Sequence, residues 1–139
     1  MIEKILVAID GSKNAYKALE YAIRLSMDYG AELLLLTVVP DFEPKCDEES
    51  AYQRMLTERA KSYLDSAKEE VEETNQGIKF KTERVFGDPA EKIITIADKK
   101  QVDLIVLGSR GLSGVSRWVL GSVSDRVSDY AHCTVLIVK

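Results

Sequence analysis

The chain has 139 residues, of which 45% are hydrophobic and 30% are charged, and this length and composition predict one globular domain spanning residues 1–139. A net charge of −4 argues against a general nucleic-acid binder, which usually carries a basic face. No apolar run reaches the ~18 residues that a membrane span needs and no signal peptide is visible, so we expect no membrane partner and a cytoplasmic location.

The first half of the chain alternates apolar runs with helical patterns. The continuous run Ile5–Ile9 predicts a strand buried on both faces, as in a parallel sheet. Ser12 is a candidate N-cap for a helix with apolar residues at helical spacing, and Gly30 stands where that helix would end. A second apolar run, Leu33–Val39, predicts the next buried strand.

A polar segment and a long helix come next. Residues 41–50 are rich in acidic side chains and are expected to form a mobile loop. Apolar residues at helical spacing then predict a helix that ends at Gly77 and has a solvated, charged opposite face; they are Tyr52, Leu56, Ala60, Tyr63, Leu64, Ala67 and Val71. The segment Ile78–Val85 alternates apolar and polar residues, which predicts a strand at an edge of the sheet.

The second half continues the alternation. Asp88, Pro89 and Glu91 form a helix start, with a cap, a first-turn proline and an acid at the capping-box position. Leu104–Leu107 predicts a buried strand, and a helix near residues 122–131 and a strand at Val135–Val138 complete the order βαβαβαβαβ. This order implies right-handed crossovers and an α/β fold with a parallel sheet covered on both faces.

The segment from Gly108 to Ser124 carries the clearest chemistry. It joins the end of a buried strand to the first turn of a helix, where unpaired N–H groups and the helix dipole favour anions. Gly121 would let a phosphate approach the backbone, because glycine has no Cβ. Hydroxyl donors and positive charges are also present, on Ser122, Ser124, Arg110 and Arg117.

Spacing alone leaves two interpretations of this segment. It is neither a Walker A loop, because no Gly-Lys-Ser/Thr occurs, nor the G-x-G-x-x-G dinucleotide fingerprint. The glycines could equally serve tight turns. Position favours a ligand, because open parallel sheets bind ligands beyond the carboxyl ends of their strands, where Asp10, Val38 and Gly108 all lie. Asp10 would there bind a ribose hydroxyl or a hydrated magnesium ion, whereas its alternative role is a turn residue.

Five segments together resemble the universal stress protein family over nearly the whole chain: Ile5–Ser12, Gly87–Ala90, Asp103–Gly111, Gly121–Ser124 and Cys133–Val138. The ATP-binding branch of that family carries the pattern G-x2-G-x9-G-[ST]. The chain meets this pattern in full, with Gly108, Gly111, Gly121 and Ser122. The main departure is Thr134, where the family often has proline.

The resemblance implies a Rossmann-like, open parallel sheet of five strands in the order 3-2-1-4-5. It also implies a homodimer formed through Val135–Val138, which would otherwise be an exposed apolar edge. The resemblance places Asp10 on the ribose and in indirect contact with Mg²⁺. It assigns twelve residues to an ATP site: Ala8, Ile9, Asp10, Val38, Leu107, Gly108, Arg110, Gly111, Gly121, Ser122, Val123 and Ser124.

The predicted function is therefore an ATP-binding stress-response or regulatory protein that acts as a dimeric switch, with ATP and Mg²⁺ as ligands. Two alternatives remain: a slow ATPase and a nucleotide-free interaction module. Hydrolysis needs a positioned water and charge stabilisation, and no residue stands out as a base, so we assign no catalytic residue. Trp118, inside the loop, is a candidate lid, dimer contact or buried side chain.

Overall fold

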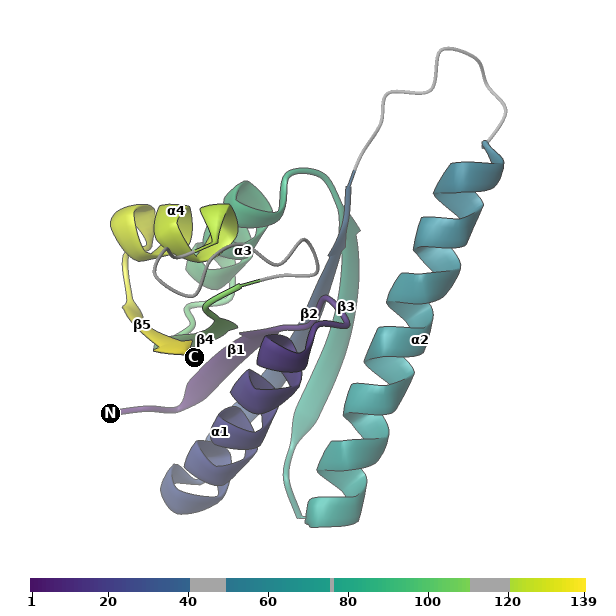
Figure 1. Ribbon diagram of the computed structural model, residues 1–139. Helices are drawn as coiled ribbons and strands as arrows, with labels where there is room; N and C mark the ends of the chain where they lie inside the picture. Colours follow the sequence, from purple (N-terminus) through teal and green to yellow (C-terminus); the bar gives the residue numbers. More distant parts are fainter. Residues whose placement is uncertain (41–49, 76, 111–120) are drawn as a thin grey trace.

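The computed structural model describes residues 1–40, 50–75, 77–110 and 121–139 (Figure 1). Strands and helices alternate through these ranges in the predicted order. They are β1 (Lys4–Ala8), α1 (Lys13–Tyr29), β2 (Glu32–Val39), α2 (Ala51–Thr74), β3 (Phe80–Phe86), α3 (Pro89–Lys99), β4 (Leu104–Gly108), α4 (Ser122–Tyr130) and β5 (Thr134–Val138).

The strands form one sheet in the order β3-β2-β1-β4-β5. All four pairings are parallel, and Val7 in the central strand lies between Leu35 of β2 and Val106 of β4. The predicted α/β fold and strand order are thus confirmed. The chain winds outward in one direction from β1 to β3 and in the other from β4 to β5, so the order reverses between β1 and β4.

Two helices cover each face of the sheet (Figure 1). Ile5 and Val7 point to the face that α1 and α2 cover, whereas Leu6 between them points to the face of α3 and α4. All three side chains are fully buried. This two-sided burial is the physical reason for the continuous apolar run in β1.

The predicted helix ends are largely confirmed. The Ser12 hydroxyl accepts a hydrogen bond from the Ala15 N–H at 3.1 Å and caps α1, which ends at Gly30 with a left-handed φ of 67°. Asp88 caps α3 by accepting from the Glu91 N–H at 3.0 Å, and Pro89 lies in the first turn.

The structure differs from prediction at both ends of α2. Ser50, predicted to belong to the preceding loop, is the N-cap of α2 and forms a capping box with Gln53. At the other end the helix stops at Thr74, three residues before Gly77, because the Asn75 side chain accepts the Gly77 N–H at 2.7 Å and closes a turn. The predicted edge strand therefore begins at Phe80 and not at Ile78.

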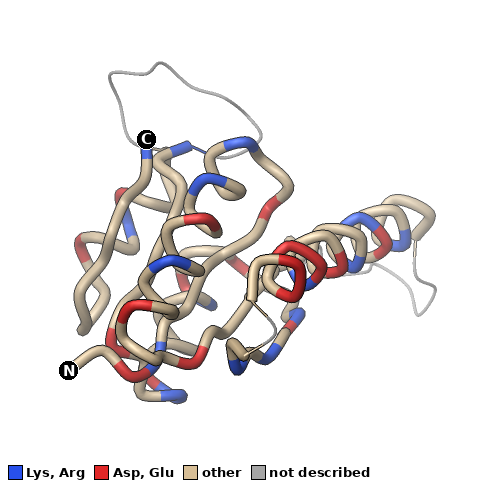
Figure 2. The backbone as a smooth tube through the Cα atoms, turned by 90° about the horizontal axis from the view of Figure 1, so that it is seen from below, with Lys and Arg blue, Asp and Glu red and all other residues tan. Residues whose placement is uncertain are grey.

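The apolar stripe of α2 is buried along only part of its length. Ala60, Leu64, Ala67 and Val71 are buried, whereas Tyr52 in the first turn is 55% exposed. The charged residues of α2, acidic and basic (Figure 2), are exposed except for the half-buried Glu70, so the prediction of a charged, solvated face is confirmed.

Candidate functional site

A cavity of about 250 Å³ opens at the carboxyl ends of β1, β2 and β4. It lies where the strand order reverses, which is the usual ligand position in an open parallel sheet. Gly111, Arg117 and Trp118 fall outside the described residues. Every other residue of the predicted site lines the cavity: Ala8, Ile9, Asp10, Val38, Leu107, Gly108, Arg110, Gly121, Ser122, Val123 and Ser124.

The cavity also has lining residues that the sequence reasoning missed: Ser12, Ala15, Leu36, Pro89 and Ser109. Leu36 could have been predicted from the sequence, because it lies two positions before Val38 and alternate residues of a strand share a face. Pro89 could also have been predicted, because it begins the helix after β3 and so lies near the carboxyl end of that strand.

One wall of the cavity is the turn between β1 and α1. Asp10 Oδ1 accepts hydrogen bonds from the Ser12 N–H at 2.9 Å and from the Ser12 hydroxyl at 2.5 Å. The same hydroxyl oxygen accepts from the Ala15 N–H, so the turn is tied into the first turn of α1. Asp10 is exposed and lines the cavity, so its turn role and a ligand role are compatible in this geometry.

Ser109 joins the opposite wall to three other elements. Its N–H donates to the Val138 carbonyl of β5 at 2.8 Å, and its hydroxyl accepts from the Asn14 amide of α1 at 3.1 Å. Its carbonyl accepts from the Gly121 N–H at 2.7 Å and from the Ser124 hydroxyl at 2.9 Å. This buried residue therefore holds the end of β4 against the start of α4.

The Ser124 hydroxyl has partners within the protein. Sequence reasoning made it a donor to phosphate, but the side chain is only 3% exposed and its hydroxyl lies within hydrogen-bonding distance of the Ser109 and Gly121 carbonyls. A hydroxyl donates one hydrogen, so in this geometry its donor is used to hold the helix start. Ser122, in contrast, is exposed and lines the cavity.

Packing requires a glycine at position 108 and leaves little room for a side chain at position 121. A Cβ on Gly108 would lie 2.7 Å from Asn14 Cβ and 2.8 Å from the Asn14 carbonyl carbon. A Cβ on Gly121 would lie 3.1 Å from the Ser109 carbonyl oxygen. The glycines thus let α1 and α4 approach the end of β4 closely, which keeps the cavity walls together.

The N-terminus of α4 is the feature of the cavity that best suits an anion. Side chains cap the other three helices among the described residues, but Gly121 at the start of α4 makes no side-chain cap bond. Ser122, Val123 and Ser124, which begin α4, all line the cavity. The N–H groups of a helix's first turn have no partners within the helix and lie at the positive end of its dipole.

An ion pair fixes the rim of the cavity beside Pro89. Asp88 caps α3 and lies 3.0 Å from a guanidinium nitrogen of Arg126 on α4. The hydrogen bond from the Glu91 N–H, and secondarily Arg126, hold the pKa of the Asp88 carboxyl below its usual value. The carboxylate therefore links the starts of α3 and α4 at neutral pH.

The described ranges contain neither a metal-binding cluster nor a membrane-spanning helix. No group of three or more His, Cys, Asp or Glu side chains there is arranged to hold a metal ion. None of the helices described is both long and apolar enough to cross a membrane.

The sequence pattern of the universal stress protein family matches residues 1–139 of this chain. The chain belongs to the universal stress protein family. Universal stress protein YxiE of Bacillus subtilis is 38% identical over 151 residues, and the match covers 100% of both sequences. The family resemblance drawn from the motifs is thus confirmed, and the chain is placed among stress-response proteins.

Solved structures of the family share the fold. That of MJ0577 from Methanocaldococcus jannaschii has a TM-score of 0.86 and 35% identity, covering 100% of this chain and 96% of that chain. A universal stress protein of Archaeoglobus fulgidus was solved in complex with dAMP. It has a TM-score of 0.75 and 20% identity, covering 100% of this chain and 98% of that chain, and at this identity the likeness shows the fold alone.

Proposed function

We propose that this universal stress protein binds ATP in the cavity at the ends of β1, β2 and β4 and acts as a nucleotide-responsive regulatory protein. The observation that carries the proposal is the start of α4, which has no side-chain cap and faces the cavity opposite Asp10. An anionic group seated there would accept hydrogen bonds from N–H groups that have no other partner in the helix.

The cavity lining offers both an apolar surface and polar groups, as a nucleotide needs. Apolar side chains of β2 and the start of α3, from Leu36, Val38 and Pro89, provide a surface for a base. The phosphates would lie at the start of α4, where Ser122 and Arg110 line the wall. Asp10, which also lines the cavity, would bind the ribose 2′-hydroxyl, with Mg²⁺ held through water.

The apolar lining from β2 together with the uncapped start of α4 supports an adenine nucleotide as the ligand class. The G-x2-G-x9-G-S spacing supports ATP within that class. We assign no catalytic residue, because Asp10, the one acid that lines the cavity among the described residues, already accepts two hydrogen bonds from Ser12. Holding the nucleotide therefore fits this site better than cleaving it.

We also propose that the protein is a homodimer formed through β5. This strand lies at one edge of the sheet, and Val135, Leu136 and Ile137 are each only partly buried. Pairing with a second copy would cover the unpaired edge. Ser109 links this strand to the cavity wall by donating its N–H to the Val138 carbonyl, so the edge strand and the proposed nucleotide site are directly connected.

The direct test of the ligand is its identity. The protein is purified without added nucleotide and denatured, and the released small molecules are identified by mass spectrometry. We expect ATP or ADP in near-stoichiometric amount. A flavin would contradict the proposal because the base would not be adenine alone, and a ligand with no phosphate would contradict it because the start of α4 would then lack its anion.

A further inference from the structure

We propose that Tyr63 of α2 is a positioning residue for the nucleotide's ribose, because its ring holds the turn that carries Asp10. The inference rests on the proposed function for its ligand. Tyr63 does not line the cavity, so it would act through the turn and not by touching the nucleotide.

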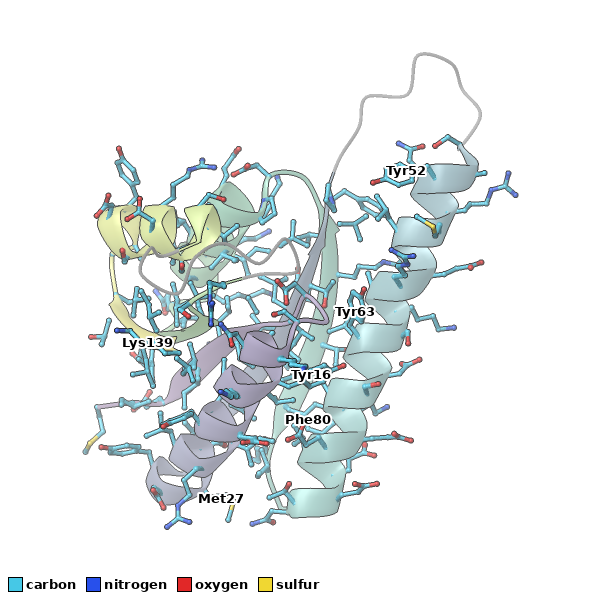
Figure 3. The ribbon with its side chains drawn as sticks, viewed as in Figure 1. Tyr16, Met27, Tyr52, Tyr63, Phe80 and Lys139 are labelled. Carbon is cyan, nitrogen blue, oxygen red and sulfur yellow. The ribbon has the colours of Figure 1, made fainter. Side chains whose placement is uncertain are left out.

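Gly11 shows where the ring lies. Its φ is +82°, in the left-handed region that favours glycine. A Cβ built on Gly11 would lie 2.5 Å from both Cε1 and Cζ of Tyr63 and 2.9 Å from Cδ1. The ring therefore occupies the space in which any other residue would carry its Cβ. Figure 3 shows Tyr63 projecting from α2 toward the end of β1 and the start of α1.

The turn is held from two sides. On the inner side, Asp10 Oδ1 accepts from the Ser12 N–H and hydroxyl, and Ser12 caps α1. On the outer side, the Tyr63 ring blocks the movement of Gly11 toward α2. The Asp10 carboxylate sits next to Gly11 in the chain, so its place at the cavity depends on both restraints.

Tyr63 is itself held firmly. It is partly buried against the core cluster on the α1 and α2 face. On the same helix, Ala60, Leu64 and Ala67 are buried around it. The ring thus extends from the well-packed part of α2, which suits it to restrict the movement of the turn at Gly11.

The first arm of the test compares ATP with dATP by calorimetric titration. In the wild type, the hydrogen bond between Asp10 and the 2′-hydroxyl should favour ATP about tenfold. Tyr63→Ala should weaken ATP binding about tenfold and dATP binding less than about twofold, since dATP lacks the 2′-hydroxyl that Asp10 would bind. Tyr63→Phe keeps the ring and should keep the wild-type preference.

Two further variants separate positioning from folding. Tyr52→Ala removes a tyrosine about three turns earlier on the same helix and should change neither affinity. If Tyr63→Ala fails to fold, Tyr63→Leu fills the core with an apolar side chain but removes the flat ring. Equal losses of ATP and dATP affinity in the folded variant, with the preference kept, would overturn the proposal.

The second arm needs no ligand. It measures amide hydrogen exchange at Ser12 and Ala15, whose N–H groups are bonded within the turn and the cap. Tyr63→Ala should speed exchange at both about tenfold and leave Val7 in β1 unchanged. Unchanged exchange at Ser12 and Ala15 would refute the restraint. If the wild type binds neither nucleotide, the proposed function fails, and this arm still decides whether the ring holds the turn.

Discussion

Gly108 illustrates how a residue of a proposed ligand site can also be required by packing. The motif spacing marks it as a phosphate-loop glycine, and the structure shows the N-terminus of α1 packed against its Cα. Ser109 next to it makes the hydrogen bonds that hold β5, α1 and α4 around the same point. Substitutions here therefore affect stability as well as binding, and the two effects must be measured separately.

Gly108→Ala should destabilise the protein by roughly 1–3 kcal/mol, as overpacking of a tight contact does. The added Cβ would meet Asn14 at 2.7 Å. Urea denaturation monitored by circular dichroism measures the change. Gly30→Ala is the matched control, because nothing lies within 4 Å of its Cβ position and its cost of about 1 kcal/mol comes from the left-handed backbone alone. A denaturation midpoint unchanged by Gly108→Ala would contradict the contact.

Ser124→Ala should lower stability by about 1 kcal/mol, the usual net value of one hydrogen bond. The loss stays modest because the Ser109 carbonyl keeps the Gly121 N–H as a donor. Binding of ATP should weaken while binding of adenosine is unchanged, because the hydroxyl holds the start of α4 near the phosphates. Ser128→Ala on the same helix, which removes an exposed bond to the Asp125 carbonyl, should alter neither. Equal effects of the two substitutions would argue against this role for Ser124.

The site residues were predictable from the sequence to the extent that they follow strand ends or helix starts. Asp10, Val38 and Gly108 were found this way, because the carboxyl ends of parallel strands meet at one edge. Ser109 was not, because it acts largely through its backbone N–H and carbonyl, which leave no mark on residue type. The Ser124 hydroxyl was assigned to a ligand because spacing does not show which way a side chain turns.

At the level of whole elements, helix starts were predicted well and the ends of α2 poorly. Caps such as Ser12 and Asp88 are local, since a side chain meets an N–H three residues on. The end of α2 depends on the Asn75 side chain closing a turn before Gly77 is reached. Periodicity also marks an apolar face without showing how much of it is covered, so Tyr52 was grouped with residues that are buried.

The start of α3 should depend on pH through Asp88. Its pKa is lowered in the folded state, chiefly by the hydrogen bond from the Glu91 N–H, so its stabilising contribution is present at neutral pH and is lost as pH falls through the folded-state pKa. Asp88→Ala should cost about 1 kcal/mol at pH 7. Denaturation at pH 7 and pH 3 should show the difference from wild type shrinking in acid. A constant difference would contradict the assignment, and Asp65→Ala on α2 is an exposed control.

The whole molecule has two sheet edges of different character. Edge strand β3 carries charged and exposed residues, as its alternating sequence predicted, whereas β5 is a short apolar strand. Charged side chains on an edge discourage pairing, and β5 has none among Thr134–Val138. The strand order itself, with β1 in the centre, came from family resemblance, because alternating strands and helices do not determine which strands are neighbours.

Ile137→Lys should convert the proposed dimer into a monomer, because a charged side chain would have to be buried where the two β5 strands meet. Sedimentation velocity measures the change. Thr82→Lys places the same charge on an exposed position of the opposite edge strand and should leave the dimer intact. A dimer that survives Ile137→Lys and is lost in Thr82→Lys would move the interface to β3.

The central claim is that the cavity holds ATP with its phosphates at the start of α4. Calorimetric titration of nucleotide-free protein with ATP and Mg²⁺ tests it most directly, using Gly121→Val as the matched variant. We predict one nucleotide bound per chain in the wild type and no measurable binding by a Gly121→Val protein that is still folded, because the side chain would occupy the phosphate position. Absence of binding heat in the wild type, or an unchanged affinity in Gly121→Val, would contradict the account.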